Sequence, residues 1–240
     1  MKALRCVALV VAAAALVGSS LGEGASGEPK KDEPKKVEWK SLFNGKDLDG
    51  WKANNTDATW KVEDDCIMGT QTEGKGGDLF HSTEYDNFEL RFTYKVAWPA
   101  NTGVWYRTDP KNATGYQFDI LKWKNPVTFS GALYFTGCKT TFAFKNLEEK
   151  TENLEDWNEA VVYANGDHLI HWLNGKMIGE AHDKTFTKGN VGFQVHGGAG
   201  FKNMKIWVRK IEIRPLAAGE KPSLPTTAPA SGPTTTPASK

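Results

Sequence analysis

Apolar and polar residues alternate along much of the chain between residues 37 and 215. The clearest run is 87–96, N-F-E-L-R-F-T-Y-K-V, in which every second residue is apolar. Because successive side chains of a strand point to opposite faces, this period predicts a strand with one face on a core. Similar short runs, separated by turn residues, follow one another along the region. The pattern therefore indicates a series of short strands.

Turn signals divide these runs into hairpins. Asn165-Gly166 and Asn174-Gly175 each lie between apolar runs, and Asn-Gly is a strong hairpin signal, so they predict a three-strand meander over 157–180. Asp64-Asp65 predicts another hairpin, and the charged stretch 145–156 is the best place for a short helix. With about a dozen short strands and almost no helix, the sequence predicts an all-β fold, a two-sheet antiparallel β-sandwich of the jelly-roll type.

The segment 101–122 gathers polar groups on one predicted sheet face. It reads as two strands, N-T-G-V-W-Y-R and G-Y-Q-F-D-I-L-K, joined by a turn. By alternation, Trp105 and Arg107 share one face, as do Gln117 and Asp119, while the residues between them are largely apolar. An aromatic beside polar groups is a candidate ligand platform. An ordinary solvated sheet face gives the same pattern, so both interpretations stay open.

The two ends of the chain differ in composition from its middle. Residues 1–22 have a basic start, an apolar run and small residues, which predicts a signal peptide and a secreted or periplasmic location. That run is too short for a membrane span. Residues 23–36 form a charged, Pro-bearing linker, and 216–240 form a Pro/Thr-rich tail; both are expected to be disordered. The folded domain is therefore expected at 37–215.

Composition narrows the ligand classes. Thirty Lys and Arg balance 29 Asp and Glu, so charge indicates no nucleic-acid partner. No phosphate loop, dinucleotide motif or zinc spacing is present, so no cofactor is evident, while a divalent ion such as calcium stays open. Cys66 and Cys138 either pair or stay as separate thiols. Most of the nine tryptophans are expected in the core, with Trp105 and Trp123 as sugar-stacking candidates.

Nine short motifs in sequence order carry a family resemblance. They are L-F-N-G-K-D-L-D-G-W, W-x-V-E-D, E-Y-D-N-F-E-L-R, N-T-G-V-W-Y-R, G-Y-Q-F-D-I-L, G-A-L-Y, W-N, H-W-L-N-G and V-G-F-Q-V-H-G-G. Over about Trp39 to Arg214 the chain resembles the 3-keto-disaccharide hydrolase domain family. The resemblance implies a concanavalin-like jelly roll that hydrolyses glycosides already oxidised to a 3-ketone. It also implies that a separate sugar 3-dehydrogenase supplies the ketone.

The resemblance assigns roles to residues on the predicted platform. Asp119 is the candidate base, Arg107 would hold the ketone or enolate oxygen, and His196 is the second acid/base candidate, although a histidine at a strand end is often simply exposed. The expected substrate contacts are Trp105, Gln117, Lys122 and Gln194.

Two positions depart from the family pattern as it is commonly written. Gln117 stands where the family usually has a carboxylate, and Lys122 stands where an acid is common. These departures favour an alternative, a non-catalytic carbohydrate-binding module with the same fold. A conventional two-carboxylate glycosidase is the third and weakest reading, because no second acid is evident on the same face.

Overall fold

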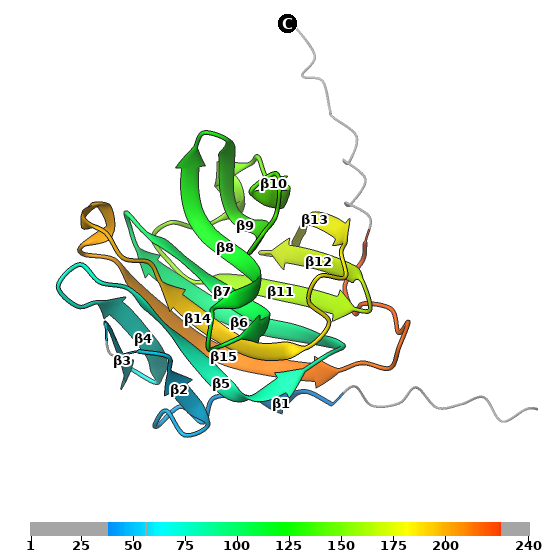
Figure 1. Ribbon diagram of the computed structural model, residues 1–240, viewed down its shortest axis with the longest axis horizontal. Helices are drawn as coiled ribbons and strands as arrows, with labels where there is room; N and C mark the ends of the chain where they lie inside the picture. Colours follow the sequence, from blue (N-terminus) through cyan, green and yellow to red (C-terminus); the bar gives the residue numbers. More distant parts are fainter. Residues whose placement is uncertain (1–37, 56, 227–240) are drawn as a thin grey trace, which may run out of the picture. The chain divides into compact units, whose positions relative to one another are not determined.

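A computed structural model of the protein describes residues 38–55 and 57–226. Within them the chain forms two antiparallel sheets and almost no helix, which confirms the expected β-sandwich (Figure 1). The predicted signal peptide, the linker and residues 227–240 of the predicted tail lie outside the described residues.

The first sheet has eight strands, in the order β13-β12-β11-β6-β15-β4-β3, with β1 beside β15. Its strands are β1 (Lys40–Ser41), β3 (Ala58–Glu63), β4 (Cys66–Gln71), β6 (Phe88–Ala97), β11 (Asn158–Asn165), β12 (His168–Leu173), β13 (Lys176–His182) and β15 (Lys205–Pro215).

The second sheet has seven strands, in the order β10-β9-β8-β7-β14-β5-β2. Its strands are β2 (Trp51–Ala53), β5 (Gly77–Tyr85), β7 (Asn101–Asp109), β8 (Thr114–Lys124), β9 (Val127–Phe135), β10 (Phe142–Asn146) and β14 (Gly189–Val195). The short 3₁₀ helices are η1 (Glu149–Thr151), inside the stretch where a helix was expected, and η2 (Ala199–Phe201).

The predicted hairpins are confirmed. Strands β11, β12 and β13 form the expected meander, with Gly166 and Gly175 in positive-φ conformations at its two turns. Asp64 and Asp65 also have positive φ, 51° and 57°, between β3 and β4. These backbone conformations suit Gly, Asn and Asp, which is why the turn residues located the strand ends.

The core lies between the two sheets. Phe92 of β6 and Phe118 of β8 meet edge-to-face, with ring centroids 5.5 Å apart. His171 is fully buried beside them, with its ring nitrogens 3.0 Å from the Tyr106 hydroxyl and 2.9 Å from the Gly131 carbonyl. Burial lowers the pKa of His171 to about 3, so this core histidine is neutral in the folded protein.

The expectation that most tryptophans lie in the core is wrong. Only three of the nine, all within the described residues, are buried: Trp51, Trp105 and Trp172. Several others lie on the outer face of the first sheet beneath cationic side chains; the guanidinium of Arg209, for example, lies 3.8 Å from the ring centre of Trp157. A long cationic side chain can cover an exposed indole and keep its charge in water, which makes such positions tolerable.

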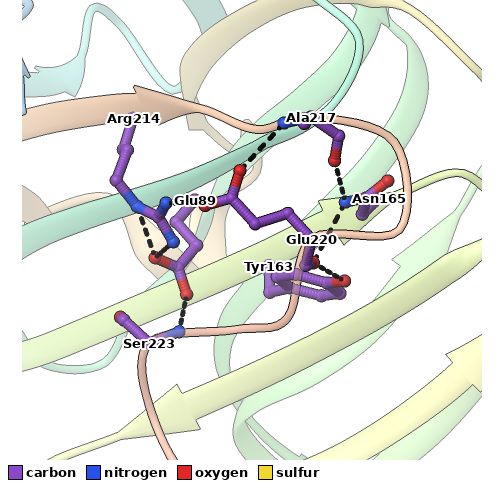
Figure 2. A network of polar contacts seen from close by, with 7 residues as sticks. All are labelled: Glu89, Tyr163, Asn165, Arg214, Ala217, Glu220 and Ser223. Carbon is purple, nitrogen blue, oxygen red and sulfur yellow. Dashed lines mark hydrogen bonds and ion pairs between the residues drawn. The ribbon is translucent and has the colours of Figure 1, made fainter. Parts of the chain in front are cut away.

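Residues 216–226, assigned from the sequence to a solvated tail, pack against the first sheet. Figure 2 shows the contacts: Arg214 pairs with Glu89 and Glu220, and the backbone N–H of Ser223 donates to Glu89. The Tyr163 hydroxyl donates to the Glu220 carbonyl. The ordered domain therefore continues beyond residue 215.

Candidate functional site

The side of the seven-stranded sheet that faces away from the core carries a cavity of about 390 Å³. Five of the seven predicted site residues line it: Trp105, Gln117, Asp119, Gln194 and His196. Its other lining residues are Asn101, Ala113, Leu121, Trp123, Tyr134, Thr136, Thr141 and Phe142. None of these lining residues is a lysine or an arginine.

Strand register explains why these side chains meet. Trp105 pairs with Gln117, and Gly103 pairs with Asp119 on one side and Gln194 on the other. Gly103 contributes no side chain, and a Cβ there would lie 2.6 Å from the Gln117 side-chain carbon Cδ. The Gln117 side chain therefore lies over Gly103, in space that only a glycine at position 103 leaves open.

Asp119 is buried, with 4% of its surface exposed, and forms no ion pair within the part of the chain that the structure describes. Burial raises the pKa of this carboxyl well above its ordinary value, opposed only by the backbone N–H of Ile120. A carboxyl with a raised pKa holds its proton more firmly and is a stronger base once it has lost it.

Gln117 supplies the complementary donor. Its Nε2 atom is buried and has no hydrogen-bond partner among the described residues. Leaving a buried donor unpaired costs free energy, so an oxygen of a bound ligand that accepted this hydrogen bond would recover the loss. Gln117 and Asp119 share one strand face two residues apart, as the alternation predicted.

His196 is exposed at the end of β14, with Nδ1 2.6 Å from the Gly197 carbonyl. A proton on Nδ1 satisfies that contact and leaves Nε2 free to exchange a proton with a ligand; this tautomer is inferred from the contact.

Residues of β4 and of the β4–β5 turn support the loop that carries His196. Gln71 donates from Nε2 to the His196 carbonyl at 2.7 Å, and the Gly198 N–H donates to the Gly74 carbonyl at 2.8 Å. At Gly76, a Cβ would lie 2.2 Å from the Val195 carbonyl oxygen. The glycine-rich stretch 73–77 therefore packs backbone to backbone against this loop.

Asp78 does not line the cavity but holds Trp105, which does, and the sequence did not reveal this contact. Its Oδ1 accepts a hydrogen bond from the Trp105 indole at 2.9 Å, and its Oδ2 accepts one from Asn54 at 3.0 Å. Burial raises the pKa of Asp78, and these two hydrogen bonds partly offset the rise. Asp78 pairs in register with Gln194, but only knowledge of that long-range pairing would have pointed to it.

Arg107 does not line the cavity, contrary to the expectation that it shares a face with Trp105. The pairing of β7 and β8 shifts register between Tyr106 and Asp109, and Arg107 has φ 48°. Its side chain is 1% exposed and donates to the backbone carbonyls of Asp86 and Gly166, each at 2.7 Å. The bulge breaks the alternation, so the Arg107 side chain points away from the cavity and is buried against these backbone carbonyls.

Lys122 also lies outside the cavity. Its ammonium pairs with Glu149 at 2.8 Å and lies 5.4 Å from the ring centre of Trp98. Trp123, in contrast, lines the cavity and is 41% exposed, so it is the aromatic best placed for stacking on a ligand. Trp105 is 3% exposed and forms a buried wall.

Three further expectations concern metals, thiols and membranes. Among the described residues, no three His, Cys, Asp or Glu side chains come together in a way that could hold a metal ion. Cys66 and Cys138 are separate free thiols. No helix in the described part of the chain has the length and apolar character needed to cross a lipid bilayer.

Known proteins resemble this chain at two levels. The profile of the 3-keto-alpha-glucoside-1,2-lyase-like domain matches residues 38–214. A 3-keto-disaccharide hydrolase of Bacteroides thetaiotaomicron is 35% identical over 75 residues, which are 28% of this chain and 26% of that protein. The match thus spans about a quarter of that relative.

Solved structures agree on the fold. A candidate glycosyl hydrolase from Parabacteroides distasonis has a TM-score of 0.57 and 24% identity, covering 75% of this chain and 94% of that one. A Bacillus subtilis protein of unknown function with a galectin-like fold has a TM-score of 0.55 and 11% identity, covering 70% and 90%. The Emp47p carbohydrate recognition domain has a TM-score of 0.57 and 15% identity, covering 76% and 99%. At these identities the likeness concerns the fold alone.

Proposed function

Because the chain belongs to the 3-keto-alpha-glucoside-1,2-lyase-like domain family, we propose that it cleaves glycosides whose sugar carries a ketone at C3. The observation that carries the proposal is the pairing of Asp119, a buried carboxyl with a raised pKa, with the unpartnered Nε2 donor of Gln117 in one cavity. A base next to an oxygen-binding donor is what removal of a proton beside a ketone requires.

In the proposed reaction, Asp119 removes the proton from C2 of the keto-sugar. The electron pair of that C–H bond forms the enolate, whose oxygen accepts a hydrogen bond from Gln117 in place of the role expected for Arg107. The enolate then expels the aglycone from C1, and His196 donates a proton to the leaving oxygen. Water adds across the resulting C1–C2 double bond, with hydroxyl at C1 and hydrogen at C2, which completes a net hydrolysis.

The surroundings of Asp119 favour this role. A general base works best when its pKa lies near the working pH, and burial without a cation moves the pKa of this carboxyl upwards in that direction. The chemistry needs a substrate that is already a ketone, so a separate sugar 3-dehydrogenase would have to supply it. We further propose a location outside the cytoplasm, on the strength of the predicted signal peptide.

The direct test compares Asp119→Asn with the unchanged protein on a chromogenic 3-keto-glucoside. Loss of the base is expected to lower kcat about 10²- to 10⁴-fold, while circular dichroism stays unchanged. Asp65→Asn, which alters an exposed carboxylate in the β3–β4 turn and lines neither cavity, is the matched control and should keep full activity. The unoxidised glucoside should not be cleaved. Normal turnover by Asp119→Asn would refute the assignment of the base.

The second candidate function is a carbohydrate-binding module without activity. Gln117 favours it, because an amide stands where the family pattern usually has a carboxylate and an amide cannot act as a base. This alternative predicts saturable binding of sugars to the cavity with no turnover of either glucoside, and loss of that binding when Trp123 is replaced by alanine.

A further inference from the structure

A second cavity, of about 540 Å³, is lined by residues of or next to β2, β5 and β14 and by the β7–β8 turn. Its lining is polar around one aromatic ring: Lys52, Ala53, Asn54, Asn55, Phe80, His81, Ser82, Pro110, Lys111 and Asn190. None of these residues lines the first cavity. The proposed reaction makes no use of it.

The two cavities are neighbours on one sheet. Gly192 of β14 pairs with Phe80 of β5 on one side and with Trp105 of β7 on the other. A Cβ at Gly192 would lie 2.3 Å from the Phe80 ring, so that ring lies over Gly192, between the second cavity and the Trp105 wall of the first.

Two further contacts link the cavities. The β7–β8 turn contributes Lys111 to the second cavity and Ala113 to the first. Asn54 in the second cavity donates to Asp78, which in turn accepts the hydrogen bond from Trp105 in the first. The two cavities are therefore adjacent along the sheet, on either side of Phe80 and Trp105.

The cavities differ in charge. Lys52 and Lys111 line the second cavity from separate elements, and both are exposed and form no ion pair within the described residues. Asp109, the carboxylate nearest to Lys111 in sequence, accepts hydrogen bonds from the backbone N–H of Lys111 and from the Asn112 side chain. The first cavity has no lysine or arginine. Positive charge on this stretch of the sheet thus lies beside the candidate reaction site.

We propose that the second cavity is a subsite for the leaving group of the substrate, and that this leaving group is a sugar acid carrying a carboxylate. The inference rests on the proposed function, because it assumes that the keto-sugar occupies the first cavity. The amides and the serine hydroxyl supply hydrogen bonds to ring hydroxyls, Phe80 supplies an apolar surface, and the two ammonium groups attract the carboxylate.

The test uses two disaccharides with the same 3-keto-glucosyl unit, one with glucose and one with glucuronate as the leaving sugar. The unchanged protein should have the higher kcat/KM for the glucuronate substrate, and the preference should shrink as salt is added. In Lys52→Gln/Lys111→Gln the preference should fall about 2- to 30-fold, because each exposed charge pair contributes a factor of about 1.4 to 5. Lys184→Gln, an exposed lysine elsewhere, should leave it unchanged.

The outcomes separate this inference from the proposed function. Cleavage of both substrates with equal kcat/KM by the unchanged protein, or an equal loss on both in the double variant, would overturn the subsite and leave the reaction standing. If neither disaccharide is cleaved, the proposed function fails. The subsite is then decided by calorimetric binding of the glucuronate disaccharide: tighter binding than the glucose one, lost in the double variant, supports it, and equal binding overturns it.

Discussion

Arg107 is expected to support the fold and not the reaction. Its Nε donates to the Asp86 carbonyl and its Nη1 to the Gly166 carbonyl, both at 2.7 Å, and these carbonyls belong to the β5–β6 and β11–β12 turns. A hydrogen bond to a charged group contributes about 1.5–3 kcal/mol, so the two together are worth about 3–6 kcal/mol. Its longer contacts with Phe186 and Asn87, at 3.3 and 3.4 Å, are left out of this sum.

The informative change is Arg107→Met, which keeps an apolar stem and removes every donor. Against a typical total of about 5–15 kcal/mol, a loss of 3–6 kcal/mol is large and should be plain in urea unfolding followed by tryptophan fluorescence. The unfolding free energy of Arg107→Lys should lie between those of the unchanged protein and Arg107→Met, because an ammonium cannot match the planar fork of donors. Lys188→Met is the control: Lys188 pairs with Glu84 in an exposed position, so its loss should leave the unfolding free energy almost unchanged.

Measuring kcat of the same variant tests whether Arg107 also takes part in the reaction. At a temperature where Arg107→Met is still folded, its kcat on the 3-keto-glucoside should stay within about threefold of the unchanged protein, since Arg107 does not line the cavity. A variant with unchanged unfolding free energy and a hundredfold lower kcat would refute the structural role. It would return Arg107 to the catalytic position that strand alternation predicted.

Two further variants test the core and the support of the His196 loop. Because the pKa of His171 falls from about 6.5 to about 3 on folding, protons favour the unfolded chain, and stability should decrease by on the order of 5 kcal/mol as pH falls from 6.5 to 3. Urea unfolding of His171→Gln at pH 7 and pH 4 should show a smaller decrease; parallel pH curves would contradict the assignment. Gly76→Ala places a Cβ against backbone, 2.2 Å from the Val195 oxygen, and should cost about 1–3 kcal/mol and lower kcat, whereas Gly200→Ala, with open space around it, should do neither.

Strand alternation predicted the parts of the site that lie within regular strands. Trp105, Gln117 and Asp119 line one cavity because β7 and β8 keep a two-residue period through those positions. Gln194 and His196 were found for the same reason, at the end of another strand. These inferences needed only the local sequence, since the direction of a side chain from a strand is fixed by its parity.

Other parts of the site depend on contacts that the local sequence does not encode. Gln71 supports His196 from 125 residues away, and Asp78 and Asn54 reach Trp105 only through the pairing of strands. The half-buried tryptophans outside the core were missed because an indole covered by an arginine has the same composition signature as a core residue. Register and sheet order would have been needed to place them.

The wrong placement of Arg107 also changes the expected pKa of Asp119. With Arg107 on the same face, the carboxyl would lie near a fixed cation, which would lower its pKa and keep it a weak base. The bulge after Tyr106 removes the cation from that face, and burial alone then raises the pKa of Asp119. A single departure from alternation therefore reverses the direction of the shift. It also leaves Gln117 as the oxygen-binding donor beside a carboxyl that can act as a base, the combination on which the proposed reaction depends.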